Sequence, residues 1–161
     1  MDLDIRQAVR AVLLDEDDRL LLVRFVFPSG IEVWALPGGG LQPNEAPIDG
    51  LRRELDEELS LTGVAIGPEI WERTHIIPMR NGQDGQHDRI FIVRVNHFEP
   101  QPKIGWEALN DELVFEMRWW SIDEIDAAHE AGARFAPRRL GEYARRVIEG
   151  EIPDYPVDVG V

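Results

Sequence analysis

A glycine triplet leads into an acid-rich segment, "GGGLQPNEAPIDGLRRELDEELSL", at residues 38–61. Within this segment, leucines recur at every fourth position, which is the spacing of one apolar stripe on an α-helix: Leu51, Leu55 and Leu59. The stripe predicts a helix over about residues 44–59, with Asn44 as its N-cap and Pro47 in its first turn. The glycine triplet predicts a loop before that helix.

Several acids of this segment fall on one face of the predicted helix. Glu54, Glu57 and Glu58 stand at i, i+3 and i+4, whereas Asp56 points elsewhere and is predicted to be an ordinary surface acid. Like charges at this spacing repel, so either solvent and flanking arginines absorb the repulsion or a cation belongs there. A solvated face is the commoner meaning of such spacing alone. Carboxylate oxygens are also the ligands that Mg²⁺ and Mn²⁺ prefer.

The composition of the whole chain narrows the classes of protein to which it can belong. Its 161 residues and 43% hydrophobic content suit a single domain over residues 1–161. The absence of cysteine excludes a disulfide, a cysteine nucleophile and a thiolate metal site. The net charge of −14 disfavours nucleic-acid polymers and acidic lipids as partners. A small anionic substrate remains compatible with this charge if a divalent cation bridges it to the protein.

The chain shows no sequence signal for a membrane or for export. No apolar run approaches the roughly 20 residues that span a bilayer. The acidic start "MDLDIRQAV" lacks the basic and apolar regions of a signal peptide. We therefore expect a cytoplasmic protein without a membrane partner.

Strand patterns dominate the rest of the chain. Apolar runs at residues 7–14 and 19–27 flank "DEDD" and predict a hairpin. Residues 89–98 and 113–121 predict two further strands, and the segment between them, "EPQPKIGWEALNDE", predicts a loop. Strands with one central helix and helices at the end predict the α/β (α+β) fold class, with a mixed sheet packed by helices.

The C-terminal part of the chain carries helix signals. Ser121 and Glu124 stand in capping-box spacing at the start of one predicted helix. A second helix is predicted from Pro137 to Gly150. Residues 151–161 are predicted to form an irregular tail.

The central segment resembles the signature box of the Nudix hydrolases. That box reads glycine, five residues, glutamate, seven residues, Arg-Glu, an apolar residue, any residue, Glu-Glu, any residue, glycine and an apolar residue. It covers residues 39–61 here, and every specified position matches except Ser60, where the family has glycine. The segments "WALPGG" and "RWWSIDEI" are also similar to Nudix flanks, so the resemblance extends over about residues 8–125. It implies an α/β/α sandwich in which the loop and helix of the box carry a metal site.

The resemblance implies a role for each matching residue of the box. The implied metal ligands are three carboxylates and one backbone carbonyl: Glu54, Glu57, Glu58 and Gly38. Arg53 and Glu45 are implied to support these ligands as a second layer of contacts. The family often adds a glutamate from a loop before the last strand, as a base or a further ligand. Glu107, Glu112 and Glu116 lie in that region, and Glu112 is favoured because it ends the loop, with Glu58 as the competing base.

Four residues outside the box are candidate substrate contacts: Arg24, Arg80, Arg89 and Trp106. The arginines suit phosphate, although solvated surface charges are the commoner case. Trp106 suits stacking on a base, although a tryptophan that anchors a loop is the commoner case.

The predicted function is a Mg²⁺-dependent pyrophosphohydrolase, with Mn²⁺ as another metal that the site would accept. Its catalytic residues are predicted to be Arg53, Glu57, Glu58 and Glu112. The substrate is a nucleoside diphosphate derivative: a nucleoside triphosphate, a damaged nucleotide or a nucleotide sugar. The resemblance also makes a homodimer an expectation. The alternative is a Nudix-fold module that senses a nucleotide metabolite without cleaving it.

Overall fold

One mixed β-sheet organises the chain in the computed structural model, which describes residues 2–161. Its strands are β1 (Ile5–Leu14), β2 (Leu20–Val26), β3 (Glu32–Ala35), β4 (Gly38–Gly40), β5 (Glu69–Ile76), β6 (Gly85–Arg94), β7 (Val114–Trp120), β8 (Phe135–Ala136) and β9 (Val157–Asp158). Its helices are α1 (Pro47–Leu59), α2 (Trp106–Asp111), α3 (Ile122–Glu130) and α4 (Leu140–Ile148). The strand order is β8-β3-β2-β1-β6-β5-β9, with β4 beside β1 and β7 beside β2.

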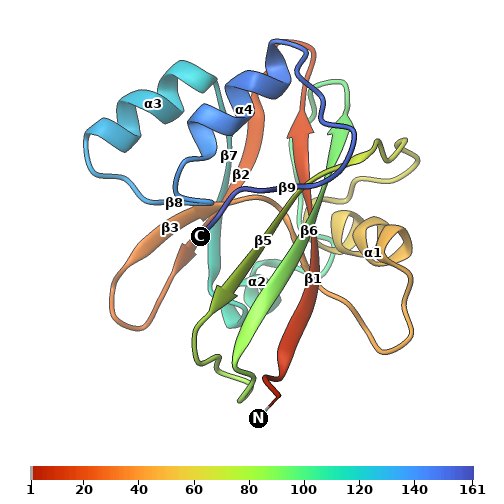
Figure 1. Ribbon diagram of the computed structural model, residues 1–161, viewed down its shortest axis with the longest axis vertical. Helices are drawn as coiled ribbons and strands as arrows, with labels where there is room; N and C mark the ends of the chain where they lie inside the picture. The colour runs from red at the N-terminus through yellow and green to blue at the C-terminus, as the bar shows by residue number, and fades with distance from the viewer. Residues whose placement is uncertain (1) are drawn as a thin grey trace.

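Strand β1 lies in the middle of the sheet and presents a different helix layer on each face. It pairs in parallel with β6 along its whole length, and it meets β2 in the predicted hairpin at Leu14 and Leu20. Because side chains alternate along a strand, Val9 and Leu13 pack with α1, while Val12 and Leu14 pack with α3 and α4. Figure 1 shows α1 on one side of β1 and α3 with α4 on the other. The predicted mixed sheet packed by helices is therefore confirmed.

Helix α1 carries the leucine stripe as predicted, but it starts later than the sequence indicates. The stripe residues are at most 1% exposed and pack in one cluster with β1: Leu51, Leu55 and Leu59. The helix begins at Pro47, after the N-cap Ala46, and no side chain caps it. The prediction that Asn44 caps the helix is wrong. Asn44 adopts a left-handed turn conformation instead, with φ 64°, which asparagine tolerates better than most residues.

Ser60, which replaces the expected glycine, keeps the helix end that glycine would make. It is left-handed, with φ 55° and ψ 35°. Its N–H donates to the Asp56 carbonyl at 2.9 Å, and the Leu61 N–H donates to the Leu55 carbonyl at 3.2 Å. The Ser60 hydroxyl donates to the Gln101 carbonyl at 2.5 Å. That bond offsets part of the roughly 1–2 kcal/mol that a side chain costs in this conformation.

Three segments are more regular than the sequence predicts. The predicted loop at residues 99–112 contains α2, which Leu109 anchors at 1% exposure. The glycine triplet forms β4, which pairs antiparallel with β1. The predicted irregular tail at residues 151–161 contains β9. All three elements are too short to produce a periodic hydrophobic signal, so tertiary pairing determines them.

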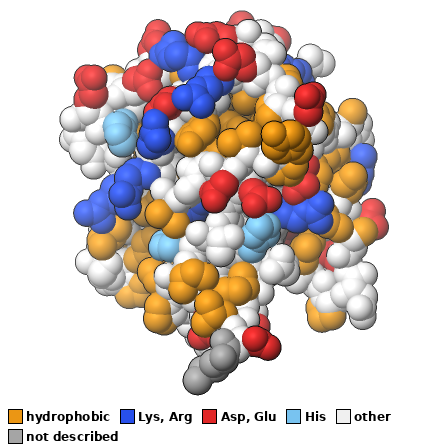
Figure 2. Space-filling view, in the orientation of Figure 1, with side chains coloured by type: hydrophobic (Ala, Val, Ile, Leu, Met, Phe, Trp, Pro, Cys, Tyr) orange, Lys and Arg blue, Asp and Glu red, His pale blue; other side chains and the backbone are white. Residues whose placement is uncertain are grey.

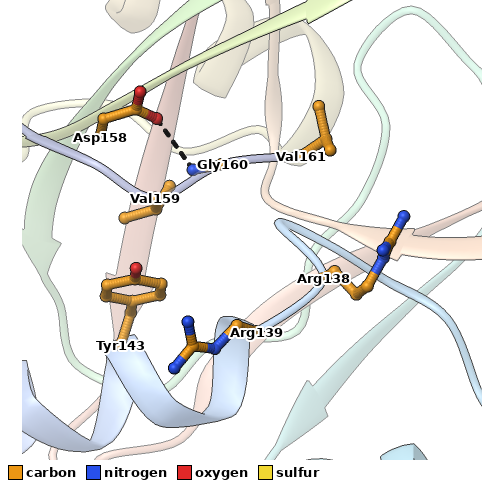
Figure 3. A pocket seen from close by; sticks show the side chains of 7 residues that line it. All are labelled: Arg138, Arg139, Tyr143, Asp158, Val159, Gly160 and Val161. Carbon is orange, nitrogen blue, oxygen red and sulfur yellow. Dashed lines mark hydrogen bonds between the residues drawn. The ribbon is translucent and has the colours of Figure 1, made fainter.

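The C-terminal segment closes one edge of the sheet. Strand β9 pairs in parallel with β5 at Trp71, and Val159 behind it is 4% exposed. Figure 3 shows the Asp158 carboxylate accepting the N–H of Gly160, in a pocket that Tyr143 of α4 also lines. None of the glutamates of α1 lines this pocket.

The remaining helix predictions hold in part. The capping box of Ser121 and Glu124 is confirmed. The last helix begins at Leu140 and not at Pro137, because β8 keeps the chain extended just before that proline.

The surface agrees with the acidic composition. Figure 2 shows acidic side chains interspersed with basic ones over the upper part of this face. Over residues 2–161, no helix combines the length and apolarity needed to cross a membrane.

We expect Ser60→Gly to be more stable than Ser60→Ala by about 1 kcal/mol, because alanine retains the cost of the left-handed conformation and glycine does not. Both variants lose the hydrogen bond to Gln101, so their difference isolates the backbone contribution. Urea unfolding at pH 7 measures the free energy of unfolding of each variant. Equal values would show that the turn carries no conformational cost.

Candidate active site

The glycine strand β4 allows the backbone to approach the glutamates of α1 closely. A Cβ on Gly39 would lie 2.7 Å from the carboxylate carbon and from both oxygens of Glu54. A Cβ on Gly38 would overlap the Val9 carbonyl, and the Gly38 φ of 142° also favours glycine. The Gly38 N–H donates to Glu58 Oε1 at 3.2 Å. Only glycines at these two positions permit this contact between strand and helix.

Arg53 holds the acidic face of α1 together. Its guanidinium makes two hydrogen bonds to Glu45, each 2.9 Å long. One terminal nitrogen donates to Glu54 at 2.9 Å and to Glu57 at 3.3 Å. The other also donates to the Gly40 carbonyl at 3.0 Å. These contacts support the bracing role predicted for Arg53 and Glu45.

The carboxylates on this face have shifted pKa values. Burial, reinforced by the charge of Glu54, raises the pKa of Glu58 to about 8. Burial also raises the pKa of Glu54, although the hydrogen bond from Arg53 opposes this shift. Hydrogen bonds from Arg53 instead lower the pKa of Glu45 to about 2. The buried Glu58 and the partly buried Glu54 thus have too little positive charge beside them, and a cation would supply it.

Glu112 lies on a separate segment that is fastened to α1. The Ile104 N–H donates to the Glu57 carbonyl at 3.2 Å, and α2 follows with Glu112 as its C-cap. Partial burial and the charge of Glu57 raise the pKa of Glu112. The charge of Glu112 in turn contributes to the raised pKa of Glu58. The fold therefore brings Glu112 close enough to the acidic face of α1 for their charges to interact.

The donor set fits a hard divalent cation. In the part of the chain that the structure describes, no three acids or histidines already converge on a common point as metal ligands. Arg53 nevertheless presents Glu54 and Glu57 together, and the buried Glu58 lies beside them against β4. Oxygen ligands alone, with negative charge in excess, are the set that Mg²⁺ and Mn²⁺ prefer.

Two predicted substrate contacts are engaged in ion pairs. Arg24 on β2 donates to Glu116 at 3.0 Å and to Glu32 at 2.6 Å. Arg89 on β6 donates to Glu69 at 2.7 Å. Neither arginine is hydrogen-bonded to a glutamate of α1, so a role in substrate binding stays a prediction for both.

The other two predicted contacts are more accessible. Arg80 is exposed in the turn between β5 and β6. Trp106 is 42% exposed and opens α2, on the segment that ends at Glu112. Its exposure shows that it is not a core residue, and base stacking stays a prediction.

A buried charged cluster beside β4 is absent from the sequence predictions. Asp88 is 1% exposed and accepts hydrogen bonds from Arg10 at 3.0 Å and from Arg73 at 3.1 Å. One signal for it is present in the sequence, because Arg10 interrupts the apolar run "AVRAVLL". An arginine is almost never buried in such a run without a partner. The partner itself is 78 residues away in the chain, so the sequence does not identify it.

Comparison with known proteins points to one family. The family model described as the NUDIX domain matches residues 4–139. The chain is similar to the nucleoside triphosphatase NudI of Escherichia fergusonii, with 31% identity over 83 residues that cover 50% of this chain and 59% of that protein. It is also similar to the RNA pyrophosphohydrolase of Rickettsia peacockii, with 28% identity over 78% of this chain and 80% of that protein.

The matched share of these relatives varies. The chain spans 32% of the length of another RNA pyrophosphohydrolase, from Saccharophagus degradans. Among solved structures, the E. coli ORF135 protein matches with a TM-score of 0.64 and 22% identity, over 94% of this chain and 96% of that one. This structural likeness bears on the fold alone.

We expect Glu45→Gln to lower the free energy of unfolding at pH 7 by about 1–2 kcal/mol, because Arg53 loses its charged partner. The folded pKa of Glu45 is about 2, below the ordinary value of 4.5, so its stabilisation is present above pH 4.5 and is lost as the pH falls through 2. Urea unfolding of wild type and variant between pH 7 and pH 3 measures the difference, which should shrink with falling pH.

Glu130→Gln is the matched control, since Glu130 is exposed at the end of α3. A Glu45→Gln deficit that stays constant from pH 7 to pH 3 would contradict the assigned ion pair.

Proposed function

This chain belongs to the NUDIX domain family, and from that membership we propose that it is a Mg²⁺-dependent pyrophosphohydrolase. Its substrate is a small nucleoside diphosphate derivative: a nucleoside triphosphate, a damaged nucleotide or a nucleotide sugar. The observation that carries the proposal is the arrangement of Glu54, Glu57 and Glu58 on one face of α1, braced by Arg53 and laid against the glycine strand.

We assign separate roles in metal binding to the ligands and to the arginine that supports them. The proposed ligands are the three box glutamates and the carbonyl of Gly38. A divalent cation bound there would neutralise the diphosphate and lower the pKa of an attacking water. Arg53 keeps Glu54 and Glu57 side by side, so the ligands need little rearrangement when the cation binds.

Glu112 is the proposed general base. Glu58 already accepts the Gly38 N–H and is buried, which suits a ligand held in one orientation. Glu112 lies on a different segment, and its raised pKa makes its carboxylate a better proton acceptor than an ordinary glutamate. If Glu112 is the base, its glutamine variant should lose turnover and keep the wild-type affinity for the metal. The glutamine variant of a metal ligand should lose both.

The relatives support a nucleotide substrate. The names nucleoside triphosphatase and RNA pyrophosphohydrolase both describe cleavage at a phosphoric anhydride. The charge of −14 favours a small substrate over an RNA polymer, because an acidic surface repels a run of phosphates. We propose a cytoplasmic location for this activity, and we propose a homodimer because the family resemblance implies one.

We expect Glu57→Gln and Glu58→Gln each to reduce turnover by about a hundredfold or more, because each removes a charged ligand. Asp56→Asn is the control on the same helix. Asp56 pairs with Lys103 at 2.8 Å and should change turnover less than about twofold, since exposed pairs contribute little. Initial rates with Mg²⁺ and a preferred nucleotide measure all three variants. Unchanged rates for both glutamine variants would contradict the proposed site.

A hydrolysis screen over a panel of nucleotides, with product identification, tests the function directly. Cleavage should require Mg²⁺ or Mn²⁺ and stop when a chelator removes the metal. Hydrolysis that persists in the chelator would contradict the metal requirement. Tight binding of a nucleotide without cleavage would instead support the non-catalytic sensor.

A further inference from the structure

A charged cluster lies buried between β1, β5 and β6. Its members are at most 9% exposed: Arg10, Arg73 and Asp88. Asp88 accepts hydrogen bonds from Arg10 at 3.0 Å, from Arg73 at 3.1 Å and from Gln86 at 2.8 Å. The Asp88 carboxylate is therefore held from three sides and has little freedom to rotate.

Arg73, at one end of the cluster, is held by the C-terminal segment. Arg73 donates through Nε to the carbonyl of Gly160, which follows β9, at 3.1 Å. Two guanidinium groups share the single carboxylate of Asp88, so the cluster has an excess of positive charge. Charged groups this deeply buried destabilise a fold unless each has a partner.

At the other end of the cluster, Arg10 contacts the connection that leads into the glycine strand β4. Arg10 uses Nε for Asp88 and a terminal nitrogen for the Leu36 carbonyl, at 2.9 Å. Leu36 lies two residues before Gly38, in the short connection between β3 and β4. The Ala11 N–H also donates to the Pro37 carbonyl, at 3.0 Å. Arg10 and the backbone of its own strand together set the path of this connection.

The connection leads directly to the proposed metal ligands. Gly38 follows Pro37, and its N–H is bonded to Glu58. The Cγ of Arg10 would lie 3.0 Å from a Cβ on Gly38, so the arginine stem also packs against this residue. A displacement of Arg10 would therefore move the backbone that orients Glu58 and carries the Gly38 carbonyl.

We propose that Asp88 and Arg10 are positioning residues, which set the β3–β4 connection and the Glu58 side chain for divalent-metal binding. The inference rests on the proposed function for its choice of metal ligands. Asp88 fixes the guanidinium of Arg10, and Arg10 fixes the Leu36 carbonyl. In this proposal neither residue is a metal ligand or a substrate contact. Partners of this kind, one contact behind the ligands, commonly change metal affinity by about 10–100-fold when mutated.

Arg10→Lys tests the inference. Lysine keeps the positive charge near Glu58, but a single ammonium does not reproduce the planar fork that joins Asp88 to the Leu36 carbonyl. Titration of the protein with Mn²⁺ alone, with free Mn²⁺ followed by electron paramagnetic resonance, should show a dissociation constant raised about tenfold. Turnover should recover at saturating Mn²⁺, because the ligands themselves remain. Asp88→Asn should shift the affinity in the same direction wherever it yields folded protein.

Val147→Ala is the control for stability. Val147 is 1% exposed on α4 and shares an apolar cluster with Leu36, but it takes no part in the hydrogen bonds of Arg10, so the variant loses thermal stability and keeps those bonds. It should bind Mn²⁺ with the wild-type dissociation constant. An Arg10→Lys protein whose dissociation constant stays within about twofold of wild type would overturn the inference.

Different experimental results would overturn the proposed function and the positioning role. A wild-type protein that binds Mn²⁺ but cleaves no nucleotide would overturn the function, and weakened Mn²⁺ binding by Arg10→Lys would still support the positioning role. A wild-type protein that cleaves nucleotides, alongside an Arg10→Lys variant with unchanged Mn²⁺ affinity, would overturn the positioning role alone.

Discussion

The candidate site depends on the close approach of β4 to α1. Because Gly39 has no side chain, the carboxylate of Glu54 lies directly against the strand. The approach is possible only because the leucine stripe on another side of α1 is fully buried against the sheet. Helix α1 therefore has two structural roles. Its apolar face sets its distance from the sheet, and its acidic face places the carboxylates against the glycines of β4.

Positive charge surrounds this acidic face without neutralising it. Arg53 binds the carboxylates from the helix side, where it lowers the pKa of Glu45 but leaves that of Glu54 raised. Arg10 approaches from the sheet side, and its charge only partly opposes the effect of burial on Glu58. The fold therefore gathers carboxyl groups that resist ionising together, and a small cation of high charge density favours their ionised forms better than a further side chain would.

Sequence patterns predicted those parts of the structure that depend on residues close together in the chain. The leucine stripe, the hairpin around "DEDD" and the capping box at Ser121 each follow from residues within a few positions of one another. Asn44 shows the limit of such reasoning, because its turn conformation depends on how the preceding loop folds. Strand β9 and the partnership of Arg10 with Asp88 depend on pairing across long stretches of chain, which no local pattern records. For the site, the shared helix face of Glu54, Glu57 and Glu58 follows from their spacing, and the roles of the other box residues follow from the family resemblance. The surroundings that shift the pKa values of these carboxylates follow only from the fold.

The short strand β9 has a consequence for solubility. The outer edge of β5 would otherwise offer unpaired N–H and C=O groups to a neighbouring molecule, beside the apolar ring of Trp71. Such an open edge is a template for intermolecular strand pairing and aggregation. By pairing at Trp71 and burying Val159, the last residues of the chain cover the part of the edge nearest the core. The C-terminal segment thus leaves fewer unpaired backbone groups on this edge of the sheet, a role separate from any chemistry at the glutamates.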